Sequence, residues 1–276
     1  MRRINVGLKA GLICALAIAG LMPAGCSDKG TGGTSGNGKV VMIMHDGPVS
    51  SMKHVWLTVE SAMMIGSSAY VGQGTGPIVL AQPVRMDFLA LDSVARILAG
   101  ANIAAGTYSK IRLQVSNPEF VLANDSVVSA SDIQLVANGQ VDLNPQSWIV
   151  IDNDSTTVVS LDLDLDNSIQ VNTTGSGRFI LRPQVMVDSD SAASMKSVIL
   201  EGTVLSVNAA QSTLELQAAG GNSTVSVATS SQTQILAIGG LQVSLGSIQV
   251  GSQLSTTGRI NVHTGVVTAS RIQIAS

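Results

Sequence analysis

Three aspartates spaced two residues apart are the most distinctive candidates for chemistry in this sequence. Asp162, Asp164 and Asp166 alternate with leucines, and residues two apart on a strand share one face at about 6–7 Å. Asp152 and Asp154 come shortly before them and are expected to approach through a hairpin. Oxygen-rich clusters suit Ca²⁺, which takes about six to eight oxygen ligands. The spacing therefore predicts an acidic strand face that is a candidate calcium site.

The same aspartates also fit a purely structural interpretation. The segment DNDST at 152–156 lacks the spacing and the terminal Glu of an EF-hand loop. A solvated strand face with Lys or Arg partners would show the same pattern, and no cofactor would then be needed. Arg112, which lies between two apolar strand residues, is a candidate partner for one of the aspartates. Together with Arg182 it is also a candidate anion site.

Aromatic residues are few, at 3% of the chain. Trp56 and Trp148 alternate outward from apolar neighbours and are candidates to stack on a sugar ring. The alternative is that they fill a core or an inter-domain contact. Tyr108 follows a turn at Ala105-Gly106 and enters a strand, which predicts a hydroxyl bond back across the turn, as in the tyrosine corner of β-sandwiches.

Catalytic signatures are weak. His45, His54 and His263 are the only histidines, and His45 is followed by Asp46. The sequence has no Gly-x-Ser-x-Gly elbow and no cysteine placed as a nucleophile. Asp46 is expected to cap a turn, and the histidines lack a zinc-binding spacing. The sequence predicts a protein that is not an enzyme.

The N-terminus predicts export. Arg2, Arg3 and Lys9 precede the apolar run 10–21, and the small residues Ala24 and Gly25 precede Cys26, which is the layout of a secretory signal. The ending AGC is similar to a bacterial lipobox, which predicts lipidation of Cys26. The alternative is an ordinary signal that leaves Cys26 as a free thiol. Ser27, in place of an Asp, favours an outer-membrane or cell-surface destination.

Composition narrows the partners. Charged residues make up only 12% of the chain and the formal net charge is −3, so exposed faces are expected to be neutral and polar. No basic stripe with interleaved aromatic rings is present, which argues against nucleic-acid binding. The expected partners are a membrane, through the lipid anchor, and a glycan or another envelope protein.

Short alternating stretches separated by Gly-rich turns predict an all-β protein. The expected fold is an N-terminal immunoglobulin- or transthyretin-like β-sandwich followed by a small OB-like β-barrel. One short helix of two turns is predicted within residues 87–103. The predicted order is a signal peptide at 1–25, a flexible tether at 26–38, the sandwich at 39–188, a linker at 189–196 and the barrel at 197–276.

Several motifs carry a resemblance to known families. The N-terminal part resembles the domain-of-unknown-function family forty-three eighty-two. The matching motifs are HDGP at 45–48, where the family tends to have Ser-Asp-Ala-Pro, HVWLTVESAMM at 54–64, AGTYSKIRL at 105–113, LDLD at 161–164 with SI at 168–169, and LRP at 181–183. The resemblance implies a lipoprotein without an established activity.

The C-terminal part is similar to the domain-of-unknown-function family fifty-six sixty-six, on EGTV at 201–204, LGSIQVG at 245–251 and VTASRI at 267–272. This likeness implies a small closed barrel and supplies no catalytic residues. The leading hypothesis is a lipid-anchored, non-enzymatic binding or structural module of the cell envelope. The alternative hypothesis is a calcium-binding or metal-dependent accessory protein that uses the aspartate face.

Overall fold

The first strand, β1 (Asn37–Asp46), carries a run of consecutive buried apolar residues from Val40 to Met44. A strand that is buried on both faces shows such a run in place of alternation. β1 pairs in parallel with β11 (Thr156–Leu163) and antiparallel with β5 (Ala95–Ala104). Two different hydrophobic cores lie on its two sides, because Val40 and Met42 belong to one and Val41 and Ile43 to the other.

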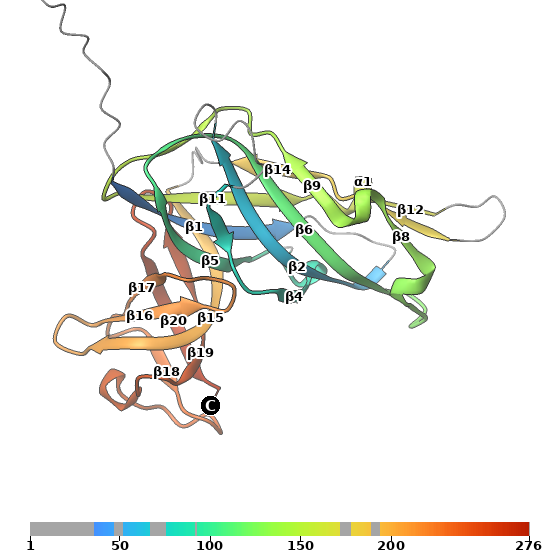
Figure 1. The fold of residues 1–276 in the computed structure, drawn as a ribbon. Coiled ribbons are helices and arrows are strands. Elements are labelled where there is room, and N and C mark those ends of the chain that lie inside the picture. The colour runs from blue at the N-terminus through green and yellow to red at the C-terminus, as the bar shows by residue number, and fades with distance from the viewer. Residues whose placement is uncertain are drawn as a thin grey trace, which may run out of the picture. The chain divides into compact units, whose positions relative to one another are not determined.

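The computed structural model describes residues 36–46, 52–66, 76–91, 93–171, 178–188 and 194–275. Nearly all regular structure in these residues is β (Figure 1), which confirms the predicted all-β class. Within them, no helix is long and apolar enough to cross a membrane.

Two layers of strands form the N-terminal sandwich. The first layer is the β14-β11-β1-β5 part of the larger sheet, where β14 spans Val185–Asp188. In Figure 1 the long strands of the second layer run across β1 and β11. The second layer comprises β2 (Met52–Gly66), β3 (Ile78–Leu80), β4 (Val84–Asp87), β6 (Gly106–Leu122), β7 (Val127–Val128), β9 (Gln140–Leu143) and β10 (Ile149–Ile151).

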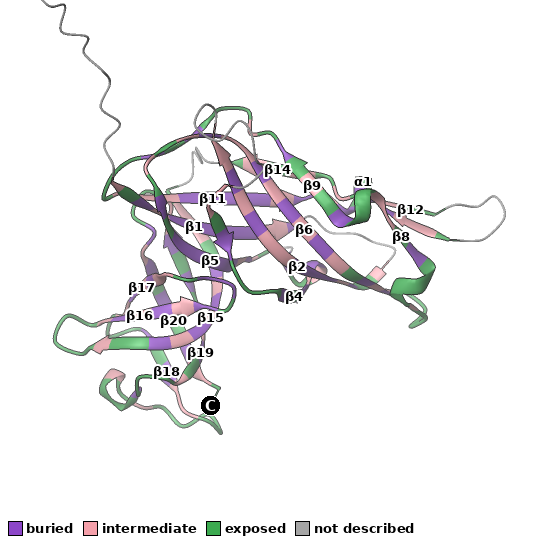
Figure 2. Cartoon of the chain, viewed as in Figure 1, coloured by how far each residue is buried: buried purple, intermediate pink, exposed green. Residues whose placement is uncertain are grey.

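The sandwich core fills the space between these layers. Apolar residues of β2 and β6 alternate between buried and more exposed positions, as Figure 2 shows. Leu57, Met64, Ile111 and Phe120 from these strands are almost fully buried against the β1 and β11 face. The alternation of apolar and polar residues in the sequence therefore indicates a layer whose core lies on one side only.

Smaller elements complete the sandwich. The short strands β8 (Ile133–Leu135), β12 (Ile169–Val171) and β13 (Phe179–Leu181) form a third sheet. Single helical turns are η1 (Phe88–Leu91), η2 (Ala130–Asp132), η3 (Val136–Gly139) and α1 (Leu165–Ser168).

The C-terminal strands close into a ring. The chain forms β15 (Met195–Asn208), β16 (Thr213–Ala218), β17 (Thr224–Ala228), β18 (Gln234–Leu236), η4 (Leu245–Ser247), β19 (Gln253–Asn261) and β20 (Val267–Ile274). β15 pairs with β16, β16 with β17, β17 with β20, β20 with β19, and β19 with β15. This circuit is the small barrel expected from the sequence.

The barrel and the sandwich share a sheet and a core. β15 continues the first layer by pairing in parallel with β5. The turn after β16 lies directly on β5, because a Cβ at Gly221 would sit 2.7 Å from the backbone nitrogen of Gly100. Asn222 and Ser223 donate backbone hydrogen bonds to the Gly100 carbonyl at 3.1 and 2.9 Å. Glycines at both positions allow this close backbone approach.

Residues 87–103 differ from the prediction. They form the single 3₁₀ turn η1 followed by the strand β5, so the predicted two-turn helix is wrong at this place. β5 is buried toward both cores, as Leu98 and Ile97 show, and apolar residues on both faces of a strand imitate a helical spacing.

The predicted linker at 189–196 overlaps β15, which begins at Met195, and residues 189–193 lie outside the described residues. The proposed boundary between two domains therefore stays a prediction.

Candidate functional site

A cavity of about 330 Å³ lies where the β10–β11 connection meets the turn between β19 and β20. Its walls come from segments that are more than 100 residues apart in the sequence, so only the fold assembles it. The residues that line it include Trp148, Val150, Asp152, Thr157, Val262 and His263. We refer to it as the Trp148 cavity.

β10 fixes the direction in which Trp148 points. Ile149 and Ile151 pair with β6 and are fully buried in the sandwich core. Because side chains alternate along a strand, Trp148 and Val150 face outward, and they are 63% and 53% exposed. The outward orientation predicted for Trp148 is thus observed.

The connection from β10 to β11, which passes from one layer of the sandwich to the other, is held by backbone and hydroxyl hydrogen bonds. Ser155 donates from its backbone nitrogen and its hydroxyl to the Asp152 carbonyl, at 3.3 and 2.9 Å. Thr157 donates its hydroxyl to the Val150 carbonyl at 3.2 Å. Asp154 adopts a positive φ of 55° and donates its backbone N–H to the Asn37 carbonyl at 3.0 Å. These hydrogen bonds fix the backbone that carries the carboxylate of Asp152.

The turn between β19 and β20 is also held in place, by hydrogen bonds and by packing. The side-chain oxygen of Asn261 accepts the backbone N–H groups of His263 and Thr264 at 2.9 and 3.1 Å. Gly265 has a φ of +67°, and a Cβ there would lie 2.4 Å from Cγ2 of Thr156. The turn thus packs against the first residue of β11, and this contact brings His263 to the cavity.

A second cavity of about 330 Å³ adjoins the first, and Thr156 lines both. Its lining is polar and includes Asn37, Lys39, Asn102, Asp154 and Ser155. Burial lowers the pKa of Lys39, an effect that the negative charge of Glu215 partly offsets. The two linings thus meet at Thr156, and together they make up a polar surface at the start of β11.

Several polar groups of this surface have no protein partner. Within the described part of the chain, the side chains of Trp148, Asp152, Thr156 and His263 make no hydrogen bond or ion pair. An indole N–H, a carboxylate, a hydroxyl and an imidazole offer both donors and acceptors to a ligand. The arrangement can hold a polar molecule without breaking protein hydrogen bonds.

The predicted aspartate face is not formed. β11 ends at Leu163, and the carboxylate of Asp164 instead caps α1 by accepting the Asn167 backbone N–H at 3.1 Å. Asp166 lies exposed within that turn. The prediction that Asp162, Asp164 and Asp166 share one strand face is therefore wrong, because a helix cap ends the alternation.

Asp152 and Asp154 lie at the other end of the same strand. β11 has 8 residues and spans about 26 Å at roughly 3.3 Å per residue. β10 and β11 lie in different sheets and form no hairpin that would bring Asp152 and Asp154 to Asp164. Among the described residues, no group of three or more His, Cys, Asp or Glu side chains is placed to hold a metal ion. The calcium hypothesis thus loses the geometry on which it depended.

Asp162 has a different neighbour, His45. The two side chains face each other across the parallel β1–β11 pair, with Nδ1 and Oδ1 at 3.3 Å. Lys196 and Asp188 lie nearby and pair with each other at 3.6 Å. Burial lowers the pKa of His45, the charge of Asp162 opposes this effect, and Lys196 adds to it. Asp46 is buried, and its Oδ1 accepts the Leu165 backbone N–H at 3.4 Å.

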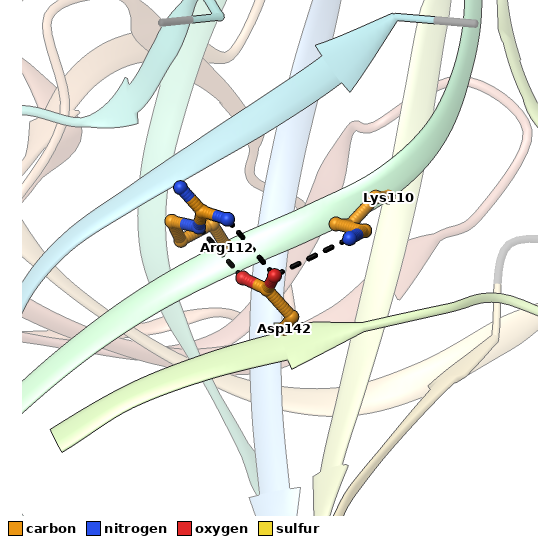
Figure 3. Close-up of polar contacts among 3 residues, drawn as sticks. All are labelled: Lys110, Arg112 and Asp142. Carbon is orange, nitrogen blue, oxygen red and sulfur yellow. Dashed lines mark hydrogen bonds and ion pairs between the residues drawn. The ribbon is translucent and has the colours of Figure 1, made fainter. Parts of the chain in front are cut away.

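Arg112 forms a close ion pair that the sequence did not predict. Its Nε and Nη2 donate to the two carboxylate oxygens of Asp142 at 2.6 and 2.9 Å, and Lys110 donates to the same carboxylate at 3.3 Å (Figure 3). The guanidinium lowers the pKa of Asp142 through these hydrogen bonds. Arg112 therefore partners Asp142 of β9, and the expected pairing with one of the β11 aspartates is wrong.

Arg182 and Trp56 lie in other surroundings. Arg182 follows β13 and is exposed, with its backbone N–H bonded to the Ser168 carbonyl at 2.8 Å. Trp56 is half-buried on β2, and the Arg85 guanidinium lies 5.6 Å from its ring centroid. A cation above the ring occupies a face that a sugar would use. Trp148, in contrast, borders the Trp148 cavity and has no cation above its ring among the described residues.

Sequence reasoning missed His263 and Thr156 as site residues. In the sequence, His263 stands out only as one of three histidines, and Thr156 carries no signal. The Asn261 to Gly265 turn is readable as a turn from Thr264-Gly265, but its contact with β11 is not. Cys26 lies outside the described residues, so its predicted lipidation stays a prediction.

Comparison with known proteins adds a family. No curated protein and no solved structure matches the chain. Residues 37–183 match the family model described as Domain of unknown function (DUF4382). This match covers the sandwich from β1 to β13, including all of β10 and β11, and more than half of the chain. The chain belongs to the DUF4382 family.

Proposed function

We propose that this chain is an exported envelope protein, anchored by a lipid on Cys26, whose folded part binds a polar ligand and catalyses no reaction. One observation carries the binding role: the Trp148 cavity presents a ring, a carboxylate and a hydroxyl that have no hydrogen-bond partner within the described residues. Groups held in place on paired strands lose little conformational freedom when a ligand binds.

The anchor would keep this surface close to a membrane. Ten residues separate Cys26 from Gly36, and a chain extends by at most about 3.6 Å per residue. Gly36 would then lie within about 36 Å of the lipid-bearing residue. Asn37 lines the second cavity, so the ligand belongs to the envelope region next to that membrane, with the outer membrane or the cell surface favoured.

The barrel offers a further argument by analogy of fold. Five-stranded barrels with this pattern of pairing use loops between their strands to bind oligosaccharides or oligonucleotides. The β19–β20 turn that carries His263 is such a loop. The low content of charged residues, 12%, argues against an oligonucleotide.

The anchor is tested by metabolic labelling of the full chain with a palmitate analogue. The native chain and a Cys14→Ser variant are expected to be labelled and to fractionate with membranes, whereas Cys26→Ser is expected to lose the label. Cys14 is a matched control because it is the other cysteine of the chain and lies inside the predicted signal. Equal labelling of both variants would contradict the proposal.

The binding role is tested by photo-crosslinking in intact cells. A photoreactive amino acid replaces Val150, which is exposed and lines the Trp148 cavity. The control replaces Val127, which is 64% exposed on β7, another strand paired with β6. High-mass adducts are expected at position 150 and not at position 127. The absence of adducts at position 150 would contradict a ligand at this cavity.

A further inference from the structure

We infer that the Trp148 cavity and the second cavity across Thr156 form one extended binding site for a neutral glycan strand, with a sugar ring stacked on Trp148. This inference rests on the proposed binding function and names its ligand class. It is argued from the ring, the polar groups, the charges and the length of the surface.

Trp148 supplies the aromatic ring. Trp148 is 63% exposed next to Val150 on a strand whose alternate residues are locked in the sandwich core. An exposed indole on a rigid backbone offers a flat apolar face, which matches the C–H face of a pyranose, and an N–H at its edge. Burying this face against a sugar removes apolar surface from water at little cost in side-chain entropy.

The polar groups match hydroxyls. A sugar hydroxyl is both a donor and an acceptor, and it is best held by carboxylates, amides and hydroxyls. Asp152 and Thr156 line the Trp148 cavity, and Asn37, Asn102 and Asp154 line the second. Such a lining suits a polyhydroxylated chain better than an apolar peptide side chain, which would leave the carboxylate of Asp152 and the hydroxyl of Thr156 unpaired.

The charges favour a neutral polymer. The lining carries the carboxylates of Asp152 and Asp154 against the single ammonium of Lys39. An anionic polymer would bring like charges toward the two carboxylates. A phosphate- or uronate-rich strand is therefore disfavoured.

The length of the surface points to several sugar units. Each cavity has a volume of about 330 Å³, near the lower end of the roughly 300–1,000 Å³ range of small-molecule sites. Because Thr156 lines both cavities, a ligand seated on Trp148 can continue into the second cavity. Affinity is thus expected to rise with the number of sugar units.

The two tryptophans provide a direct test. The full mature chain in detergent is prepared as Trp56→Phe, which leaves Trp148 as the only tryptophan, and as Trp148→Phe, which leaves Trp56. Each is titrated with cello-, malto- and chito-oligosaccharides of two to six units and with a galacturonate hexamer. A neutral hexamer is expected to shift the emission of the Trp148 reporter to shorter wavelength and to leave the Trp56 reporter unchanged.

Two variants, followed by calorimetry, locate the ligand. Trp148→Ala is expected to weaken binding of a neutral hexamer about tenfold, the effect of losing one stacked ring. Asn102→Ala is expected to weaken binding of the hexamer but not of the dimer, because Asn102 lines the second cavity. Equal losses for both lengths would overturn the extended site. Tighter binding of the galacturonate hexamer than of every neutral one would overturn the charge argument.

The crosslinking experiment separates this inference from the proposed function. Adducts at position 150 that carry sugar and resist protease support both. Adducts that a protease removes, combined with no response to any neutral oligosaccharide, leave a binding protein whose ligand is a peptide and overturn the glycan inference alone. No adducts and no response to any oligosaccharide would overturn both.

Discussion

The imidazole of His45 faces the carboxylate of Asp162 at 3.3 Å across two parallel strands. Lys196 from β15 and Asp188 from β14 complete the charged groups around the histidine. Lys196 also donates to the Ser160 hydroxyl at 3.0 Å. The group therefore ties the beginning of β15 to the edge of the sandwich, next to a cavity that His45 and Lys196 help to line.

His45 makes the stability of the fold depend on pH. Burial lowers its pKa below the usual 6.5, so the unfolded chain takes up this proton at a higher pH than the folded chain. The free energy of unfolding is expected to fall as the pH drops through about 6.5. Thermal melts between pH 8 and pH 5 measure this effect. His45→Gln should flatten the curve in that range; identical curves for the native chain and the variant would contradict the prediction.

Substitutions of the two aspartates after β11 distinguish a helix cap from a metal site. Asp164→Ala removes the cap of α1 and is expected to lower the free energy of unfolding by about 1 kcal/mol. Asp166→Ala is the matched control, since Asp166 is exposed, and it is expected to change stability by less than about 0.5 kcal/mol. Urea denaturation with and without calcium measures both. Equal losses that occur only with calcium would restore the calcium hypothesis.

Tyr108 confirms the predicted bond across a turn. Its hydroxyl donates to the Ala104 carbonyl at 2.7 Å, and the side chain is buried. Tyr108→Phe leaves this carbonyl without that donor and is expected to cost about 1–2 kcal/mol. Chemical denaturation of the native chain and the variant provides the measurement. An unchanged midpoint for Tyr108→Phe would show that the bond contributes nothing.

Gly265 controls the position of His263. Gly265→Ala places a methyl group about where Cγ2 of Thr156 lies, at a positive φ, and the backbone conformation alone costs about 1–2 kcal/mol. The variant is expected to lose stability and to weaken binding at the Trp148 cavity. Adding Thr156→Ser removes Cγ2 and is expected to restore part of both losses, which a double-mutant cycle measures. If the effects of the two substitutions are additive, the side chains at positions 265 and 156 are not in repulsive contact.

Local sequence patterns determined the strands, the turns and the class of the fold. Alternation in β2 and β6 predicts strands because each strand has its core on one side. The hydrogen bond of Tyr108 is also predictable, because its donor and acceptor lie only four residues apart in the sequence. These features depend on neighbours along the chain. The predicted N-terminal signal likewise rests on local composition alone.

The tertiary structure decided what long-range contacts control. The sequence of β5 predicts a helix, because the second core on the other face of this strand is not visible in the sequence. The predicted acidic face is not formed, because the carboxylate of Asp164 caps α1. The Trp148 cavity joins Trp148 to His263 through a contact between Gly265 and Thr156. No local pattern records that contact, because it depends on how a barrel turn packs against a sandwich strand that lies far away in the sequence.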